Sequence, residues 1–226
     1  MKLTHTILCL LVGVSLSAHA GDRDAEVLAL GDWSTPVPNK YGFALRGRLL
    51  ISEYPEHRGP NAKTEAALYV ELQEYSNFVG ANGEVYWNPT AVDCTLTDTS
   101  GRSVSNSPHA YGGPVPSPCW ITLPSHSSMR LRVSPYAGGR LPDGDFGIWS
   151  ARFQVWTLKA DDTNTYYLSG TFTVDPPTNR VPADFRYVWK GTLNLPKMKV
   201  GIAELKPQPS GGAYVSPVAD SPSAHP

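Results

Sequence analysis

The amino-acid sequence predicts an all-β protein, an antiparallel immunoglobulin-like β-sandwich of eight or nine strands. Three observations predict this fold class. The 21 prolines and 20 glycines cluster between short runs in which apolar and polar residues alternate. No stretch keeps a helical period over about 12 residues. Short or irregular loops join the runs, and such connections favour antiparallel pairing. A lipocalin-like barrel and a jelly roll are the alternative architectures.

The N-terminus has the pattern of a secretory signal peptide over residues 1–20. Lys2 supplies a positive charge, Ile7 to Leu16 is apolar, and Ala18-His19-Ala20 is a small-x-small cleavage site. We therefore expect a mature chain from Gly21, located in the periplasm or outside the cell. No later apolar stretch reaches the roughly 18 residues that a membrane span needs.

Charge argues against two classes of partner. Lys2 is the only charged residue of the signal peptide, so 18 basic and 20 acidic residues remain after cleavage. This near-neutral balance, without a run of Lys or Arg, disfavours nucleic acid and anionic membrane surfaces as partners.

One domain is expected over residues 40–205. Residues 21–39 form a lead-in, and residues 206–226 are a Pro/Ser/Gly tail expected to be disordered because it has little to bury. Strands are expected over residues 43–51, 66–73, 92–96, 129–133, 149–156, 166–174, 185–189, 191–195 and 199–205.

The alternation within these runs predicts which residues face the core. In residues 43–51 the odd positions are apolar, with Arg46, Arg48 and Leu50 on the other face. In residues 66–73 the even positions form the apolar face. Residues 149–156 are interpreted as one strand, with Trp149 in phase with the core and Trp156 on the outer face.

Cys94 and Cys119 are the cysteines that remain after Cys9 leaves with the signal peptide. Two cysteines in an exported protein most simply form one disulfide. Closing a loop of about 26 residues contributes about 3 kcal/mol in the loop-entropy estimate. The bridge would tether the Ser-, Gly- and Pro-rich segment 103–118. Two unpaired, buried thiols are the alternative.

Catalytic signatures are weak, so we expect no enzyme and no cofactor. His57, His109 and His126 fall in loops with Ser and Asp nearby, but Gly-x-Ser-x-Gly and His-x-x-x-His are absent. A hydrolase remains an alternative. Asp143-Gly144-Asp145 has the oxygen ligands of a calcium loop, but a tight turn explains two carboxylates better.

Copper is the other metal considered. Cys119, His126 and Met129, with His57 or His109 upstream, have the ligand types of a blue-copper site in the right order. Six residues separate Cys119 from His126, which is a long spacing, and Met129 fits the apolar face of its own strand. No metal site is therefore predicted.

Aromatic residues suggest binding instead. The chain has six Trp and eleven Tyr, and exposed rings of this kind stack on sugars or anchor protein interfaces. Segments 103–118 and 137–147 are expected contact loops, since long loops are commonly functional. The candidate binding residues are His109, Tyr111, Trp120, His126 and Trp156.

Four segments resemble exported planctomycete-like bacterial proteins with immunoglobulin-like domains: residues 67–76 (ALYVELQEYS), 94–98 (CTLTD), 168–172 (LSGTF) and 189–193 (WKGTL). The chain is also similar, more distantly, to the fold of the intracellular proteinase inhibitor family. The resemblance implies a β-sandwich and an exported location, and it carries over no catalytic residues. We therefore expect an exported binding or structural interaction module for a protein or carbohydrate. A hydrolase and a carbohydrate-binding module with exposed Trp and Tyr are the alternatives.

Overall fold

A computed structural model describes residues 26–55, 64–76, 82–108, 117–134, 138–141, 143–152, 154–177, 185–203 and 205. The expected signal peptide, His57, His109, Tyr111 and the C-terminal tail lie outside these residues. The described part of the chain is all-β and has no α-helix, which confirms the predicted class. None of its helices is long and apolar enough to cross a membrane.

Fifteen strands are assigned in the described residues, rather than eight or nine, because several short edge segments pair with longer strands. The strands are β1 (Glu26–Leu30), β2 (Val37–Pro38), β3 (Ala44–Pro55), β4 (Thr64–Glu74), β5 (Gly83–Trp87), β6 (Val92–Asp98), β7 (Ser107–Pro108), β8 (Cys119–Leu123), β9 (Ser128–Arg132), β10 (Gly139–Arg140), β11 (Phe146–Trp149), β12 (Gln154–Leu158), β13 (Tyr166–Val174), β14 (Val188–Trp189) and β15 (Gly191–Val200).

The largest sheet is built on the two longest strands, in the order β1-β3-β4-β9, with β2 also paired to β3. All of its pairings are antiparallel. The predicted alternation of β3 and β4 is confirmed: Leu45, Leu49, Val70 and Leu72 are fully buried on the inner face. The segment expected as a lead-in contributes β1 and β2 to this sheet, and Leu28 belongs to the core.

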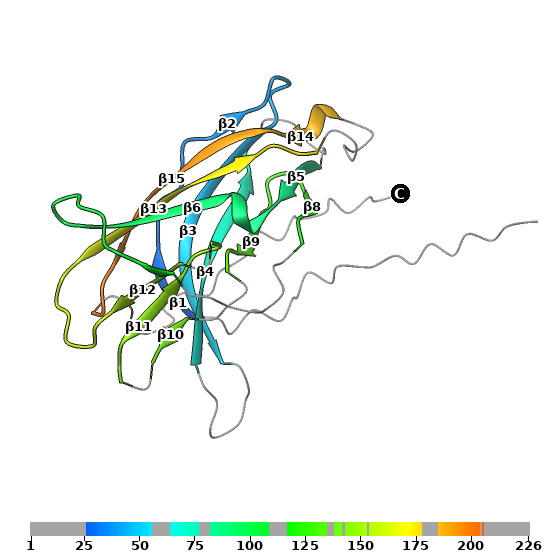
Figure 1. The fold of residues 1–226 in the computed structure, drawn as a ribbon. Coiled ribbons are helices and arrows are strands. Elements are labelled where there is room, and N and C mark those ends of the chain that lie inside the picture. Colours follow the sequence, from blue (N-terminus) through cyan, green and yellow to red (C-terminus); the bar gives the residue numbers. More distant parts are fainter. Residues whose placement is uncertain are drawn as a thin grey trace, which may run out of the picture.

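A second layer consists of β6, β13 and β15, in the order β15-β13-β6. Figure 1 shows this layer in front of β3 and β4, with its strands crossing theirs. The two layers come close together at Gly47 of β3. A Cβ atom there would lie 3.0 Å from Leu195 Cδ2 and 3.2 Å from Leu193 Cδ1, both on β15. Glycine at this position lets the two layers pack tightly.

Two smaller sheets complete the fold, in the orders β10-β11-β12-β7 and β14-β5-β8. The first continues the edge of β4 beyond β9, because Gly138 and Ala66 exchange backbone hydrogen bonds of 2.7 and 3.2 Å. The pairing of β14 with β5 is parallel, unlike the pairings of the other described strands.

The interpretation of residues 149–156 as one strand is wrong. Trp149 ends β11, the chain turns, and β12 runs back with Trp156 opposite Ile148. The turn reverses the phase, so Trp156 is 1% exposed whereas Trp149 is only half-buried. A core that takes Phe146, Ile148, Trp156 and Leu158 from both strands explains the reversal.

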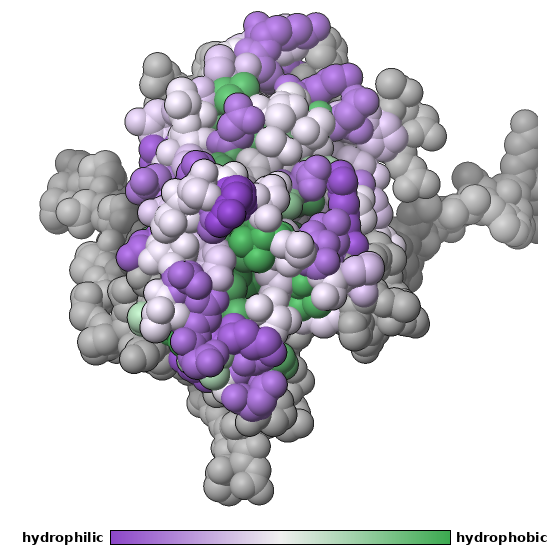
Figure 2. Space-filling model, turned by 60° about the vertical axis from the view of Figure 1, so that its left-hand side comes forward, coloured by the Kyte–Doolittle hydropathy of each residue, from purple (hydrophilic) through white to green (hydrophobic). Residues whose placement is uncertain are grey.

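The packed sheets enclose most of the strongly hydrophobic side chains. Figure 2 shows one face of the molecule, on which hydrophobic residues surface in a central strip and a few small areas among hydrophilic and intermediate ones. The large hydrophobic side chains exposed in the described residues are Leu30, Tyr41, Tyr75 and Leu141.

Candidate ligand-binding face

The outer face of β3, β4 and β9 carries a cluster of arginines and aromatic rings, which we call the arginine face. Strand pairing places Arg48, Glu71 and Arg130 in one row across the three strands. Arg46, Gln73 and Ser128 form the next row. These residues alternate with core positions, so their side chains point away from the second layer. Trp33 and Tyr75 complete the cluster.

Arg48 and Glu71 form a buried ion pair at the centre of the arginine face. Arg48 Nε donates to Glu71 Oε2 at 2.7 Å, and Nη2 lies 2.7 Å from the same oxygen. Both residues are more than nine-tenths buried. The Arg48 guanidinium also lies 4.2 Å from the Trp33 ring centre. Because Arg48 and Glu71 bond to each other and are buried, they are not available to a ligand, and they hold the arginine face in position.

Arg46, two positions earlier on β3, is held differently. Its Nε donates to Gln73 Oε1 at 2.7 Å. Its guanidinium carbon lies 4.8 Å from the ring centre of Trp33 and 4.1 Å from that of Tyr75. The two rings come from opposite sides of β3, since Ser34 bonds to Gly47 and Tyr75 to Ala44. No carboxylate among the described residues pairs with Arg46.

Positive charge is in excess on the arginine face. Glu71 is the carboxylate shared by Arg48 and Arg130, and Arg130 Nε is 3.6 Å from Glu71 Oε1, too far for a good hydrogen bond. Asp32 is exposed beside Trp33 in sequence. Three arginines around one buried glutamate give a local positive surface on a nearly neutral protein, which suits an anionic ligand.

The accessible part of the arginine face lies toward the start of β3. Leu50 and Ser52 occupy the same face farther along β3 and are buried, so the open surface ends at Arg48. Tyr75, at the other end, is 49% exposed. Tyr41, which is 37% exposed, lies in the turn that leads into β3 at this same end.

The aromatic candidates from the sequence lie elsewhere. Trp156 is buried in the core and presents no surface for a ligand. Trp120 on β8 is half-buried and packs against Tyr86, with ring centres 5.2 Å apart. The structure therefore does not bring Trp120, His126 and Trp156 into one exposed platform. His109 and Tyr111 fall outside the described residues.

His126 lies in a tight turn and contacts Glu74. Its backbone N–H donates to Glu74 Oε2 at 2.6 Å, and its φ of 59° is the left-handed conformation of a tight turn. Its Nδ1 is 3.9 Å from the same oxygen, beyond hydrogen-bond range. Ser76 Oγ donates to Glu74 rather than to the imidazole. These three side chains do not form the relay of a hydrolase triad.

The expected Cys94–Cys119 disulfide is absent from the structure, in which both cysteines are free. Cys94 points inward from β6, as its phase predicts, and burial raises the pKa of its thiol to about 12. Cys119 begins β8, belongs to a different sheet and is exposed. The alternation fixes the direction of Cys94, but it carries no information about which strand lies opposite.

Metal-binding arrangements are absent from the described residues: no three His, Cys, Asp or Glu side chains converge. In the turn considered for calcium, Asp145 Oδ2 instead lies 2.7 Å from Lys159 Nζ, and Oδ1 accepts from the Ala160 N–H. The lysine hydrogen bond lowers the pKa of Asp145 and raises that of Lys159.

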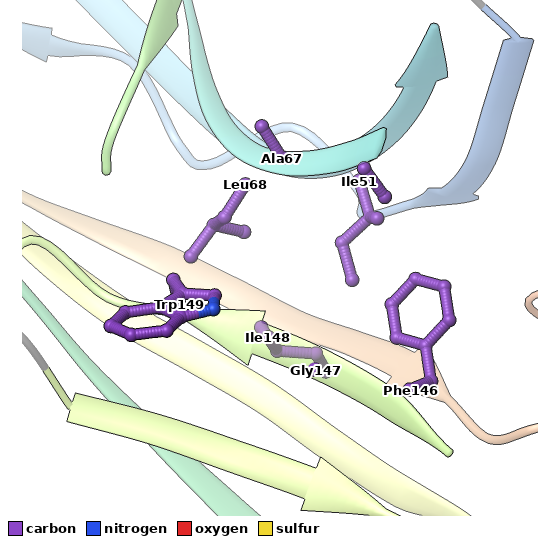
Figure 3. A pocket seen from close by; sticks show the side chains of 8 residues that line it. Ile51, Ala67, Leu68, Phe146, Gly147, Ile148 and Trp149 are labelled. Atoms are coloured by element: carbon purple, nitrogen blue, oxygen red, sulfur yellow. The ribbon is translucent and has the colours of Figure 1, made fainter. Parts of the chain in front are cut away.

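A small hollow lies between β4 and β11. Figure 3 shows Ile51 and Leu68 extending toward β11, which carries Phe146, Ile148 and Trp149. The space has no room for a water molecule. It is a packing seam between the two strands, not a binding pocket.

Sequence reasoning placed Arg46 and Arg48 on the outer face of their strand but did not treat them as a site. The available signal was the pair of arginines two positions apart on a strand whose other face is fully apolar. The contribution of Trp33 and Tyr75 depends on chain segments that the sequence does not place beside β3. No family model, curated protein or solved structure matches the chain.

Proposed function

We propose that the protein is an exported, non-catalytic binding module whose ligand is anionic and lies on the arginine face. The observation that carries the proposal is the state of Arg46: Gln73 and two aromatic rings hold its guanidinium, and no described carboxylate neutralises it. A side chain already ordered loses little entropy when it binds a ligand. Export is supported by the signal-peptide pattern of residues 1–20.

The architecture we propose is a variant of the immunoglobulin-like sandwich that the sequence predicts. Two antiparallel layers with a shared core of Leu, Val and Phe support it. Aligned sandwiches keep their layers within about 30° of each other, so an experimental structure tests this assignment directly. Layers close to perpendicular would assign the fold to orthogonal sandwiches instead.

Retention on immobilised polymers tests the binding function. The wild-type protein is passed over polygalacturonate, dextran sulfate and polyglutamate, with neutral dextran as reference. Arg46→Ala removes the proposed contact. Arg102→Ala is the matched control, because Arg102 is a highly exposed arginine on a different turn, paired with Asp98 at 3.0 Å.

The proposal predicts retention by at least one acidic polymer, with about a tenfold weaker affinity for Arg46→Ala, equivalent to about 1.4 kcal/mol. Arg102→Ala should behave as wild type. Retention by none of the acidic polymers would contradict the proposal, and so would equal losses in the two variants.

A further inference from the structure

The free edge of the Arg46 guanidinium restricts which anions fit. Gln73 occupies the Nε side, and no hydrogen bond or ion pair among the described residues uses the edge formed by Nη1 and Nη2. Trp33 and Tyr75 flank the guanidinium at 4.8 and 4.1 Å, so a ligand approaches in the plane of the fork. A carboxylate is planar and pairs with such an edge through two parallel hydrogen bonds. A carboxylate can therefore occupy this edge of Arg46 with both of its oxygens bonded.

A peptide has little to hold it at this position. Peptides that bind sheets usually add a strand at a free edge, or place apolar side chains in a groove. At Arg46, β3 is paired with β2 on one side and β4 on the other, and β4 is paired with β9 in turn. Within the described sheet β3 and β4 therefore have neighbours on both sides near Arg46, so an acidic peptide lying over Arg46 would rely on its carboxylates alone.

Sugar rings, in contrast, match the exposed aromatic surface beside Arg46. The apolar C–H face of a pyranose packs on an aromatic ring, and Tyr75 has 49% of its surface open. Arg130 supplies a second guanidinium in the adjacent row, with its side chain 32% exposed. One ring beside one cation, with another cation farther along, suits a chain that repeats sugars and charges.

We propose that the arginine face binds an acidic polysaccharide whose sugars carry carboxylates, with a carboxylate on Arg46 and a sugar ring against Tyr75. This inference rests on the proposed binding function and names its ligand class. Both contacts are required for full affinity, because the charge alone is screened at physiological salt, where the Debye length is about 8 Å.

Calorimetric titration with three probes tests the ligand class: an oligomer of galacturonic acid, polyglutamate of equal charge, and a neutral galactose oligomer. Arg46→Lys keeps the charge but loses the fork, and Tyr75→Ala removes the ring. Arg102→Lys and Tyr167→Ala are matched controls, because Tyr167 lies on β13 in the second layer, away from the arginine face. Circular dichroism confirms that each variant is folded.

The expected result is binding of the galacturonate oligomer, weakened about tenfold by Arg46→Lys and by Tyr75→Ala and unchanged by the controls. Equal, Arg46-dependent binding of polyglutamate would overturn the polysaccharide assignment and leave the binding function standing. Equal binding of the neutral oligomer would overturn the role of charge. Absence of Arg46-dependent binding to either acidic probe would overturn the inference, while retention on dextran sulfate in the polymer test would still support the function.

Discussion

Arg48 and Glu71 form an ion pair across β3 and β4, 2.7 Å apart and more than nine-tenths buried, whereas Arg46 on the same face has no carboxylate partner in the part of the chain that the structure describes. Adjacent arginines of one strand thus differ in role. Breaking a buried pair by removing one partner leaves an uncompensated charge and costs about 3–5 kcal/mol.

Glu71→Gln should therefore destabilise the protein by several kcal/mol, about 3–5, in urea denaturation. Arg46→Ala should cost clearly less, since it leaves no buried charge behind. The two variants separate the pair that fixes the arginine face from the residue offered to a ligand. A Glu71→Gln protein as stable as wild type would contradict this division.

The two cysteines should be distinguishable as free thiols. Cys119 is exposed, whereas Cys94 is buried with its pKa raised to about 12, so little of its reactive thiolate forms near neutral pH. A thiol reagent at pH 8 should label one cysteine in the native protein and two in denaturant. Cys119→Ser should abolish the native labelling. No labelling in denaturant without reductant would show the disulfide that the sequence predicts.

Gly47 should not tolerate a side chain. A Cβ atom would meet three leucines of both layers at 3.0–3.3 Å, so Gly47→Ala should cost about 1–3 kcal/mol by overpacking. Gly147→Ala is the matched control in a strand, because its nearest neighbours would be 3.9 Å away. Equal thermal stability of the two variants would contradict the close packing of β3 on β15.

Asp98 should titrate at unusually low pH. The Ser100 hydroxyl, followed by the backbone N–H and guanidinium of Arg102, lowers its pKa from 3.8 to about 2. A lowered folded-state pKa means that its contribution to stability is present above about pH 4 and is lost as pH falls through about 2. A carboxyl NMR titration should show this midpoint, and Ser100→Ala should move it upward. An ordinary midpoint in the wild type would refute the turn geometry.

Strand existence and facing were predictable wherever one strand spans the alternating run. In β6 the burial follows the period of two, with Val92, Cys94 and Leu96 buried and the residues between them exposed, because this strand has one face on the core. The prediction failed for Trp156, where a hairpin turn inserted after Trp149 shifts the phase. The alternating pattern does not reveal such a turn, because the residues between the two strands, such as Ala151, are also compatible with a strand.

The candidate site was less accessible to prediction, since it depends on contacts between distant segments. The sequence predicts that Arg46 faces outward, but not that Trp33 and Tyr75 flank it from two sides of β3. The predicted Cys94–Cys119 disulfide is absent for the same reason, because the two cysteines lie in different sheets. Residue types and their spacing indicate which side chains could form a site, whereas the order of strands in the sheets determines which side chains lie together.

The most direct test of the central claim is a residue-resolved NMR titration with a trimer of galacturonic acid. Binding at the arginine face should concentrate the shifts on the Trp33 indole N–H, the Arg46 Nε–H and the backbone of Tyr75, at the open end of this face. Shifts gathered instead around Trp120 and His126, or no shifts at millimolar trimer, would contradict the assignment of this face as the binding site for an acidic polysaccharide.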